Sequence, residues 1–280
     1  MAGILYLVST PIGNLGDMTY RAVEVLRSVD FVAAEDTRVG MKLLSAFDIQ
    51  KPLVSYYEHN KRERGEIICQ RILEGENCAL TTDAGTPAIS DPGTDLVDIC
   101  KEMGIEVVSV PGPSAIITAL SISGMECGRF CFEGFLSTNK KSRVEHLKEV
   151  AREKRTMVFY EAPHKLLRTL EDMLEYWGDR PIALCRELTK LHEEVVRTTL
   201  SEAVARYTEA APKGEFVLII GGWKPTDEEL NEGVPTMEQL LAIVAERVES
   251  GEKLSSAVKA VAQQYGVSKN TLYKAAQDME

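Results

Sequence analysis

The stretch Cys78-Ala-Leu-Thr-Thr-Asp-Ala-Gly-Thr-Pro-Ala-Ile-Ser-Asp-Pro-Gly93 joins a short apolar run to a loop rich in proline, glycine and aspartate. The run Cys78–Thr82 predicts a buried strand, and a helix is expected to begin near Thr94. Proline presets the backbone of loop 83–93, and glycine lets a ligand approach it closely. This combination is typical of a rigid cradle for a small molecule. The alternative is a long ordered turn in which Asp91 caps the next helix.

The alternation of strand, loop and helix continues from the N-terminus to about residue 222. Strands are expected at Ile4–Val8, Phe31–Glu35, Leu53–Tyr57, Cys78–Thr82 and Val107–Val110, and a second set at Phe130–Phe135, Thr156–Tyr160, Ile182–Arg186, Val195–Leu200 and Phe216–Ile220. Helices in the first set are expected to begin near Thr19, Arg38, Glu63 and Thr94. Crossovers of this length favour parallel pairing. The fold class is therefore α/β, and ten strands indicate two sheets.

Proline and glycine mark the expected domain boundaries. Pro111-Gly-Pro-Ser114 cannot continue a strand, which separates an N-terminal α/β domain, residues 1–112, from a second α/β domain, residues 113–223. Residues 224–236 are acidic, contain proline and glycine, and show no periodicity, so they predict a linker. Residues 237–280 have helical periodicity and predict a small helical C-terminal domain.

The helical tail allows two interpretations. Ala262, Gly266 and Leu272 follow the spacing of a helix-turn-helix, in which Lys269 would face nucleic acid. Residues 224–280, however, hold six Lys or Arg against ten Asp or Glu, and phosphate binding needs local positive charge. A three-helix bundle that supports a dimer or guides the substrate explains the pattern as well.

Composition excludes several classes of protein. With 280 residues, 44% of them hydrophobic, the chain is folded and is expected to have more than one domain. No apolar run approaches the roughly 20 residues of a membrane span, and Met1–Val8 has no basic leader of an export signal, so we expect a cytoplasmic protein without membrane contacts. The six cysteines and four histidines lack metal-ligand spacing, which predicts no metal site. A net charge of −11 argues against a surface that coats nucleic acid throughout.

Two further loops resemble the first in composition. Thr10-Pro-Ile-Gly-Asn-Leu-Gly-Asp17 follows the first expected strand, and Val110-Pro-Gly-Pro-Ser-Ala115 follows the fifth. Neither has the spacing of the dinucleotide fingerprint or of the ATP-binding P-loop. Because ligands bind at the carboxyl ends of strands in open α/β sheets, we expect the three loops to converge on one cleft.

Taken together, these loops and several other segments resemble the tetrapyrrole-methylase-like superfamily of S-adenosylmethionine (SAM) methyltransferases, and more closely its ribosomal RNA branch. The other segments are Ala34-Glu-Asp-Thr-Arg38, Phe132-Glu-Gly-Phe135, Phe159-Tyr-Glu-Ala-Pro-His164, Arg186-Glu-Leu-Thr-Lys190 with Glu193-Glu194, and Gly214-Glu-Phe-Val217. The resemblance covers residues 4–222, and the C-terminal helices also fit this branch. One departure is Gly85-Thr-Pro87, where other members of the superfamily carry Gly-Asp-Pro.

The resemblance implies two α/β domains of the tetrapyrrole methylase type (class III SAM methyltransferases), with SAM in the cleft between them. It also implies a homodimer that methylates the 2′-hydroxyl of a cytidine ribose in the decoding region of small-subunit (16S) rRNA, within an assembled or nearly assembled subunit, with no DNA partner. The residues that it assigns to SAM are Pro11, Gly13, Asp83, Gly85, Thr86, Ile89, Ser114, Ala115, Tyr160, Leu188 and Gly214.

Methyl transfer to a ribose hydroxyl needs alignment of the reactants and a group that removes or stabilises charge on the acceptor oxygen. Glu35, Asp36 and Arg38 follow the second strand, so we expect Glu35 or Asp36 to contact the hydroxyl and Arg38 to bind phosphate. On this interpretation Asp36→Ala abolishes turnover and leaves SAM binding intact. The alternative is that Asp36 caps a helix and forms a solvated ion pair with Arg38.

Residues 138–155 hold seven Lys or Arg against three Glu, which predicts a phosphate-binding surface that includes Lys140, Lys141 and Arg143. A charged amphipathic helix explains much of the same pattern. Lys190 is a further candidate RNA contact, with a structural ion pair as its alternative.

The sequence is also compatible with two other functions. One is a methylase of the same superfamily that acts on a tetrapyrrole or on a modified histidine of a protein. The other is a helix-turn-helix regulator whose α/β part senses a ligand. Deletion of the tail separates these classes, because a regulator would lose DNA binding whereas an enzyme would still bind SAM.

Overall fold

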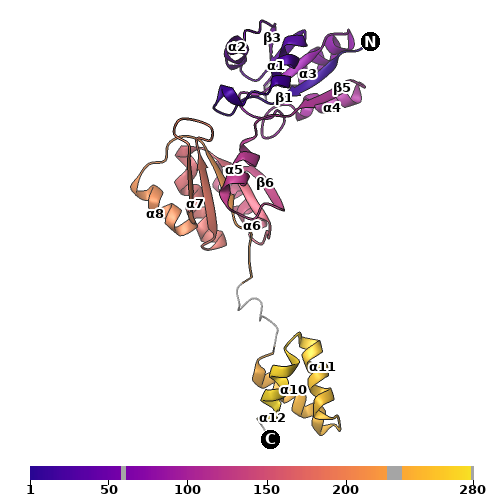
Figure 1. The fold of residues 1–280 in the computed structure, drawn as a ribbon, viewed down its shortest axis with the longest axis vertical. Helices are drawn as coiled ribbons and strands as arrows, with labels where there is room; N and C mark the ends of the chain where they lie inside the picture. The colour runs from indigo at the N-terminus through magenta and orange to yellow at the C-terminus, as the bar shows by residue number, and fades with distance from the viewer. Residues whose placement is uncertain (58–60, 226–234, 279–280) are drawn as a thin grey trace. The chain divides into compact units, whose positions relative to one another are not determined.

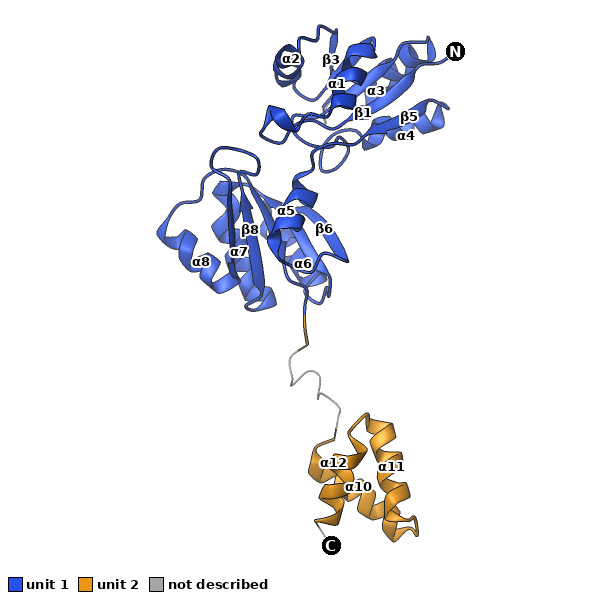
Figure 2. Ribbon diagram, viewed as in Figure 1, with its two compact units in different colours: residues 1–223 blue, residues 224–280 orange. Residues whose placement is uncertain are grey.

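The computed structural model describes residues 1–57, 61–225 and 235–278 (Figure 1). The chain forms two compact units, Met1–Trp223 and Lys224–Glu280 (Figure 2). Most of the expected linker, residues 226–234, lies outside the described residues.

The first sheet is parallel throughout, as expected. Its strands are β1 (Ile4–Val8), β2 (Phe31–Ala34), β3 (Leu53–Ser55), β4 (Cys78–Thr81) and β5 (Glu106–Val110), in the order β3-β2-β4-β1-β5. A short 3₁₀ helix, η1 (Leu15–Asp17), follows β1. Helices α1 (Tyr20–Ser28) and α2 (Thr37–Ala46) pack on one face through residues such as Leu26 and Leu44, and α3 (Lys61–Leu73) and α4 (Thr94–Glu102) pack on the other through Ile68 and Leu96.

The second sheet is mixed. Its strands are β6 (Phe130–Phe135), β7 (Thr156–Glu161), β8 (Pro181–Arg186), β9 (Glu194–Thr199) and β10 (Phe216–Ile220), in the order β6-β7-β10-β8-β9. Only β6 and β7 pair in parallel, and the other pairs are antiparallel. The seven residues between β8 and β9 are too few for a helical crossover, so these strands form an antiparallel pair. We expected parallel pairing from the length of the crossovers in the first set of strands. That expectation does not hold for the second sheet.

Helices cover both faces of the second sheet. Helix α5 (Ala115–Ser123) packs on one face through Ile116, Ala119 and Leu120. Helices α6 (Lys140–Glu149), α7 (Pro163–Trp177) and α8 (Leu200–Glu209) cover the other, where Leu170 and Trp177 belong to the core. Figure 1 shows α5 and α7 on their respective sides of these strands.

In its described residues 235–278, the C-terminal unit contains the helices α10 (Met237–Glu249), α11 (Leu254–Tyr265) and α12 (Lys269–Gln277). Its core includes Leu240, Val258 and Leu272. Gly266 ends α11 in the left-handed conformation, φ 68°, which accounts for the glycine at the turn. In the described part of the chain, no helix has the length and apolar character needed to span a membrane.

Packing of α7 on the second sheet yields a stability prediction. Leu170 is fully buried, so Leu170→Ala should lower the free energy of unfolding by about 2–5 kcal/mol through lost burial and a residual cavity. The exposed neighbour Glu171 is the control, because its replacement by alanine should change stability by only about 0.5 kcal/mol. Urea denaturation followed by tryptophan fluorescence measures both, since Trp177 lies in the same core. Equal midpoints for the two variants would contradict this packing.

Candidate active site

Three loops at the carboxyl ends of adjacent strands β4, β1 and β5 are bonded to one another. The backbone N–H of Thr10 donates to the Gly85 carbonyl at 2.8 Å, and the Gly85 N–H donates to the Thr10 carbonyl at 3.1 Å. The hydroxyls of Ser9 and Thr86 lie 3.0 Å apart, and a Cβ at Gly112 would lie 2.9 Å from the Ser9 Cβ. The loops therefore form one rigid edge, as their composition predicts.

This edge forms part of a cleft of about 480 Å³ that is also lined by the second sheet. The volume lies within the roughly 300–1,000 Å³ of pockets that bind small molecules. Eight of the eleven residues assigned to SAM from the sequence line the cleft: Asp83, Gly85, Thr86, Ile89, Ser114, Ala115, Tyr160 and Leu188. Pro11 and Gly13 flank the lining residue Ile12, and Gly214 precedes the lining residue Glu215, without lining the cleft themselves.

The remaining wall residues were not named individually from the sequence, although four of them lie in two of the loops expected to form the cleft. The remaining residues are Ile12, Ala84, Ser90, Asp91, Phe135, Glu161, Ala162, Pro163, Cys185, Glu215, Phe216 and Val217. Eight of these twelve lie at or next to the ends of strands of the second sheet, three of them at the start of β10. Their apolar pattern predicts a strand but does not indicate which residues face the cleft.

Glycine and left-handed residues shape both sides of the cleft. A Cβ at Gly13 would lie 2.5 Å from the Lys190 Cγ, so only glycine permits this close approach of the first loop to the second half of the unit. Ala88 and Ser90 have φ of 70° and 60°, and Glu187 and Thr189 on the opposite side have 51° and 65°. Such strained backbone at non-glycine residues gathers at functional sites.

Three carboxylates, Glu35 after β2 and Asp83 and Asp91 after β4, meet in the cleft wall. The Thr82 hydroxyl donates to Glu35 Oε2 at 2.9 Å, and the backbone N–H of Asp36 donates to Asp83 Oδ1 at 3.2 Å. Burial, with a further contribution from the Glu35 charge, raises the pKa of Asp91 to about 6. Asp91 does not cap α4, because Gly93 occupies the N-cap position. The sequence alternative for loop 83–93 is thus wrong on this point.

Across the cleft, Tyr160 of β7 faces this group. Burial raises the pKa of Tyr160 to about 12, and the charge of Asp91 acts in the same direction. The Tyr160 ring packs against Phe132 and Phe135 at centroid distances of 5.0 and 5.3 Å. An aromatic wall therefore stands opposite an acidic one.

Asp36 and Arg38 behave as the sequence alternative describes. Asp36 is the N-cap of α2 and accepts from the Arg38 backbone N–H at 2.8 Å and from its guanidinium Nη2 at 2.6 Å. Hydrogen bonds from Arg38 lower the pKa of Asp36 to about 2. The Arg38 side chain is 84% exposed. Of the three residues proposed for the acceptor, only Glu35 lines the cleft.

Lys190 also lines the cleft, but two carboxylates hold its ammonium group. Its Nζ donates to Glu187 Oε1 at 3.0 Å and to Glu215 Oε2 at 2.8 Å. The ion pair given as the alternative is present, and it links the β8–β9 loop to the start of β10.

Arg143 requires a correction. Its side chain is buried, with Nε donating to Asp172 Oδ2 at 2.6 Å and Nη1 donating to the Ser137 and Thr138 carbonyls. A guanidinium held inside the fold cannot lie on the surface that the sequence predicts to bind RNA. Its charge is explained by a partner on α7, which a local count of basic residues does not reveal.

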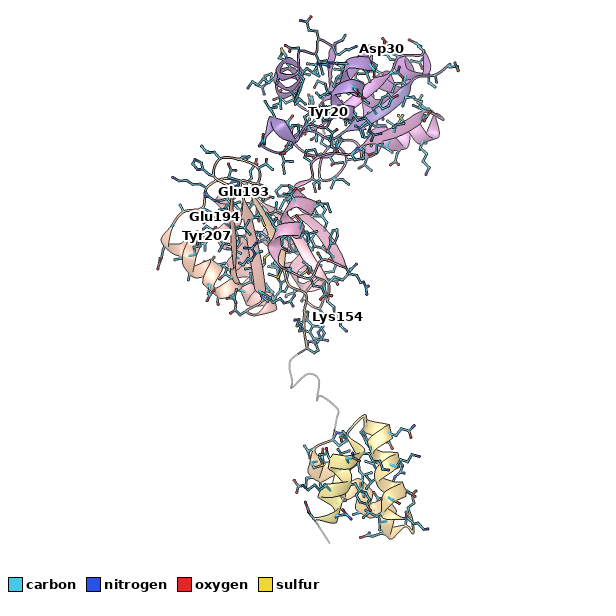
Figure 3. All side chains as sticks on the ribbon, viewed as in Figure 1. Tyr20, Asp30, Lys154, Glu193, Glu194 and Tyr207 are labelled. Carbon is cyan, nitrogen blue, oxygen red and sulfur yellow. The ribbon has the colours of Figure 1, made fainter. Side chains whose placement is uncertain are left out.

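The rest of the basic segment is divided between two ends of the sheet. Lys140 and Lys141 are exposed at the start of α6, just after the carboxyl end of β6, which lines the cleft through Phe135. Residues 150–155 precede the opposite end of β7. Figure 3 shows Lys154 at the far end of this half of the unit from Glu193 and Glu194. Lys269 is exposed at the start of α12, in the C-terminal unit.

Among the described residues, no group of three or more His, Cys, Asp and Glu side chains is arranged to hold a metal ion.

The buried pair Arg143–Asp172 yields a second stability prediction. Asp172→Asn removes the charge that compensates Arg143 and should lower the free energy of unfolding by about 3–5 kcal/mol, the usual cost of breaking a buried ion pair. Lys141→Ala is the control, because Lys141 is exposed and 4.0 Å from Glu145. Chemical denaturation measures both variants. A stable Asp172→Asn protein would mean that Arg143 is solvated.

Comparison with known proteins identifies the family. The model of the tetrapyrrole (corrin/porphyrin) methylases matches residues 4–204. A protein named ribosomal RNA small subunit methyltransferase I from Synechocystis sp. is 46% identical over 99% of this chain and 99% of its own length. A protein of the same name from Thermotoga maritima is 47% identical over 220 residues, which are 79% of this chain and 99% of that relative.

A solved structure supports the fold. Cobalt precorrin-4 methyltransferase, a cobalamin biosynthetic enzyme, has a TM-score of 0.59 at 19% identity, and the match covers 78% of this chain and 94% of that one. At this identity the likeness shows the fold alone. The family model and the near full-length relatives go further: the chain belongs to the tetrapyrrole methylase family, and within it to the group of ribosomal RNA small subunit methyltransferase I proteins.

Proposed function

We propose that this protein transfers a methyl group from SAM to the 2′-hydroxyl of a cytidine ribose in the decoding region of small-subunit (16S) rRNA. The observation that carries the proposal is a cleft of small-molecule size, built by family-specific loops, in a chain 46% identical along 99% of its length to a relative named for small-subunit rRNA methylation. We further propose that it acts in the cytoplasm, as a homodimer, on an assembled or nearly assembled subunit.

The chemistry of the cleft wall suits SAM, which carries positive charge on its sulfonium and ammonium groups. Glu35, Asp83 and Asp91 supply negative charge on one side. Ile12, Ile89 and Leu188 supply apolar surface for an adenosine, and the backbone at Gly85 is open to close approach. We therefore assign SAM to this cleft, with Pro11, Gly13 and Gly214 setting the positions of the neighbouring wall residues.

Each of the two sheets contributes residues to the proposed site. We propose that residues 1–112 and 113–223 act as two domains that hold SAM and acceptor between them. SAM, when bound, supplies an electrophilic methyl group, and the main task of the protein is then alignment. Glu35 faces the acceptor from the wall. Asp36 and Arg38 act from the rim, where Asp36 holds Asp83 through its backbone N–H.

For RNA, the exposed Lys140 and Lys141 near the carboxyl end of β6 are the best placed phosphate contacts of the basic segment. Lys190, held by Glu187 and Glu215, is better suited to ordering the cleft than to gripping a phosphate. Residues 237–280, with Lys269, are proposed to form an accessory substrate-guiding or dimer-supporting domain beyond linker 224–236. The Thermotoga relative supports an accessory role, because its match of 220 residues is about the length of Met1–Trp223.

The test is transfer of labelled methyl from SAM to small ribosomal subunits purified from cells that lack this protein. Alkaline hydrolysis of the RNA follows, because a 2′-O-methyl group blocks cleavage at its own position. One labelled, uncleaved site is the expected result. Binding of SAM without labelling of RNA would move the acceptor to a tetrapyrrole or a protein, and DNA binding without turnover would favour a regulator.

A glycine substitution tests the location of SAM. Gly85 has φ of 87° and bonds to Thr10, so Gly85→Val should distort the cleft edge and weaken SAM binding at least tenfold, with loss of turnover. Gly104→Val is the matched control: Gly104 is also left-handed, φ 69°, but has no neighbouring atom within 4 Å and lies outside the cleft. Isothermal titration calorimetry with SAM measures both. Equal affinities would place SAM elsewhere.

A further inference from the structure

We propose that Asp91 is the catalytic base that takes the proton from the acceptor hydroxyl. The proposal rests on the proposed function, because it names the group that activates the ribose oxygen in that reaction. From the sequence alone, Glu35 or Asp36 is expected to contact this hydroxyl, and Asp91 is not.

The position of Asp91 is set by its loop. It lies in the cleft wall at the carboxyl end of β4, between Ser90 with φ of 60° and Pro92, and Gly93 with φ of 148° caps the following helix in its place. Left-handed backbone at Ser90 is unfavourable for a residue with a side chain, which indicates that the loop is held in this shape for a purpose other than helix capping. The side chain is only partly exposed.

Two other carboxylates of the cleft are paired with lysines. Glu161 accepts from the Thr169 hydroxyl and the Ala162 N–H and lies 3.6 Å from Lys165 Nζ. Glu215 binds Lys190, whereas the Thr82 hydroxyl interacts with both Glu35 and Asp91. In the part of the chain that the structure describes, no Lys or Arg forms an ion pair with Asp91, so no cation competes with a substrate proton for it.

The groups that face Asp91 increase its basicity. Glu35 from the end of β2 and Asp83 from the end of β4 are negative, Tyr160 of β7 is neutral, and the Thr82 hydroxyl is a hydrogen-bond donor that acts in the opposite sense. Burial and the two negative neighbours together raise the pKa of Asp91 to about 6. A carboxylate with this pKa is mostly ionised at pH 7 and is a stronger base than an ordinary aspartate.

The ribose 2′-oxygen forms a bond to the methyl carbon of SAM while the carbon–sulfur bond breaks, and the bonding pair remains on sulfur in S-adenosylhomocysteine. The proton of the hydroxyl passes to Asp91 and is released to water after the products leave. Glu35, on the same wall, keeps Asp91 basic and acts as a positioning residue.

The test compares Asp91→Asn with Glu35→Gln and with Asp98→Asn, an exposed control on α4 outside the cleft. Methyl transfer to small subunits is measured from pH 5 to 9, SAM affinity by calorimetry, and the titration of Asp91 by carbon NMR of the labelled carboxyl. For Asp91→Asn we expect a rate loss of about 10²–10⁴-fold, the usual contribution of a general base. SAM affinity should fall far less than the rate, because Asp91 is only one of three carboxylates in that wall. Asp98→Asn should match the unsubstituted protein.

The dependence of the methyl-transfer rate on pH separates a catalytic role of Asp91 from a structural one. Because the ionised form is the active one, the rate should rise with pH through the pKa of Asp91, and that limb should vanish in Asp91→Asn. Glu35→Gln removes a negative neighbour, so it should shift both the NMR titration and the acid limb to lower pH. A shift of the acid limb of the rate together with the NMR titration would not arise if Asp91 had only a structural role.

Several outcomes would overturn the assignment. An Asp91→Asn protein with full activity, or one whose loss of SAM affinity accounts for its whole loss of rate, would remove Asp91 as the base. Ordinary titration of Asp91 near pH 4 in the unsubstituted protein would do the same, and this result does not depend on any variant folding. Loss of turnover in Glu35→Gln alone would assign the base to Glu35. If the unsubstituted protein methylates no RNA while Asp91 titrates as expected, the proposed function has failed and the base assignment fails with it.

Discussion

The site depends on one constraint, which is that the parallel strands of the first sheet all end at the same edge. Loops after β4, β1 and β5, adjacent in the sheet, are thereby brought together, and the two hydrogen bonds between Thr10 and Gly85 fix them. Proline and glycine give these loops their shape, and the strained residues Ala88 and Ser90 show that this shape is imposed by the whole edge. Without parallel pairing, the acidic side chains would not meet.

The second half contributes a different wall to the same cleft. Its mixed sheet presents the ends of β6, β7 and β10, which supply Phe135, Tyr160 and Phe216. The contact between Gly13 and the Lys190 loop joins the halves, and the pairing of Lys190 with Glu187 and Glu215 orders that loop. An acidic wall from one sheet and an aromatic wall from the other create a site that suits a cationic, partly apolar ligand.

Much of the fold could be predicted because apolar patterns are local. Strands β1, β6 and β10 have the expected bounds, and the loop motifs identified the family. Side-chain partners could not be predicted in the same way. Arg143 looks like a surface cation until Asp172, 29 residues away, is placed beside it, and Asp91 resembles a helix cap until Gly93 is found in that position. Such assignments depend on contacts that no local pattern contains.

The roles proposed for the cleft residues all require that SAM lies in the cleft between the two sheets. A crystal structure of the protein with SAM tests it most directly. We expect SAM to contact both loop 83–93 and the ends of β7 and β10, with its methyl group turned toward the wall that carries Glu35 and Asp91. SAM bound to only one half of the unit, or outside the cleft, would contradict the account.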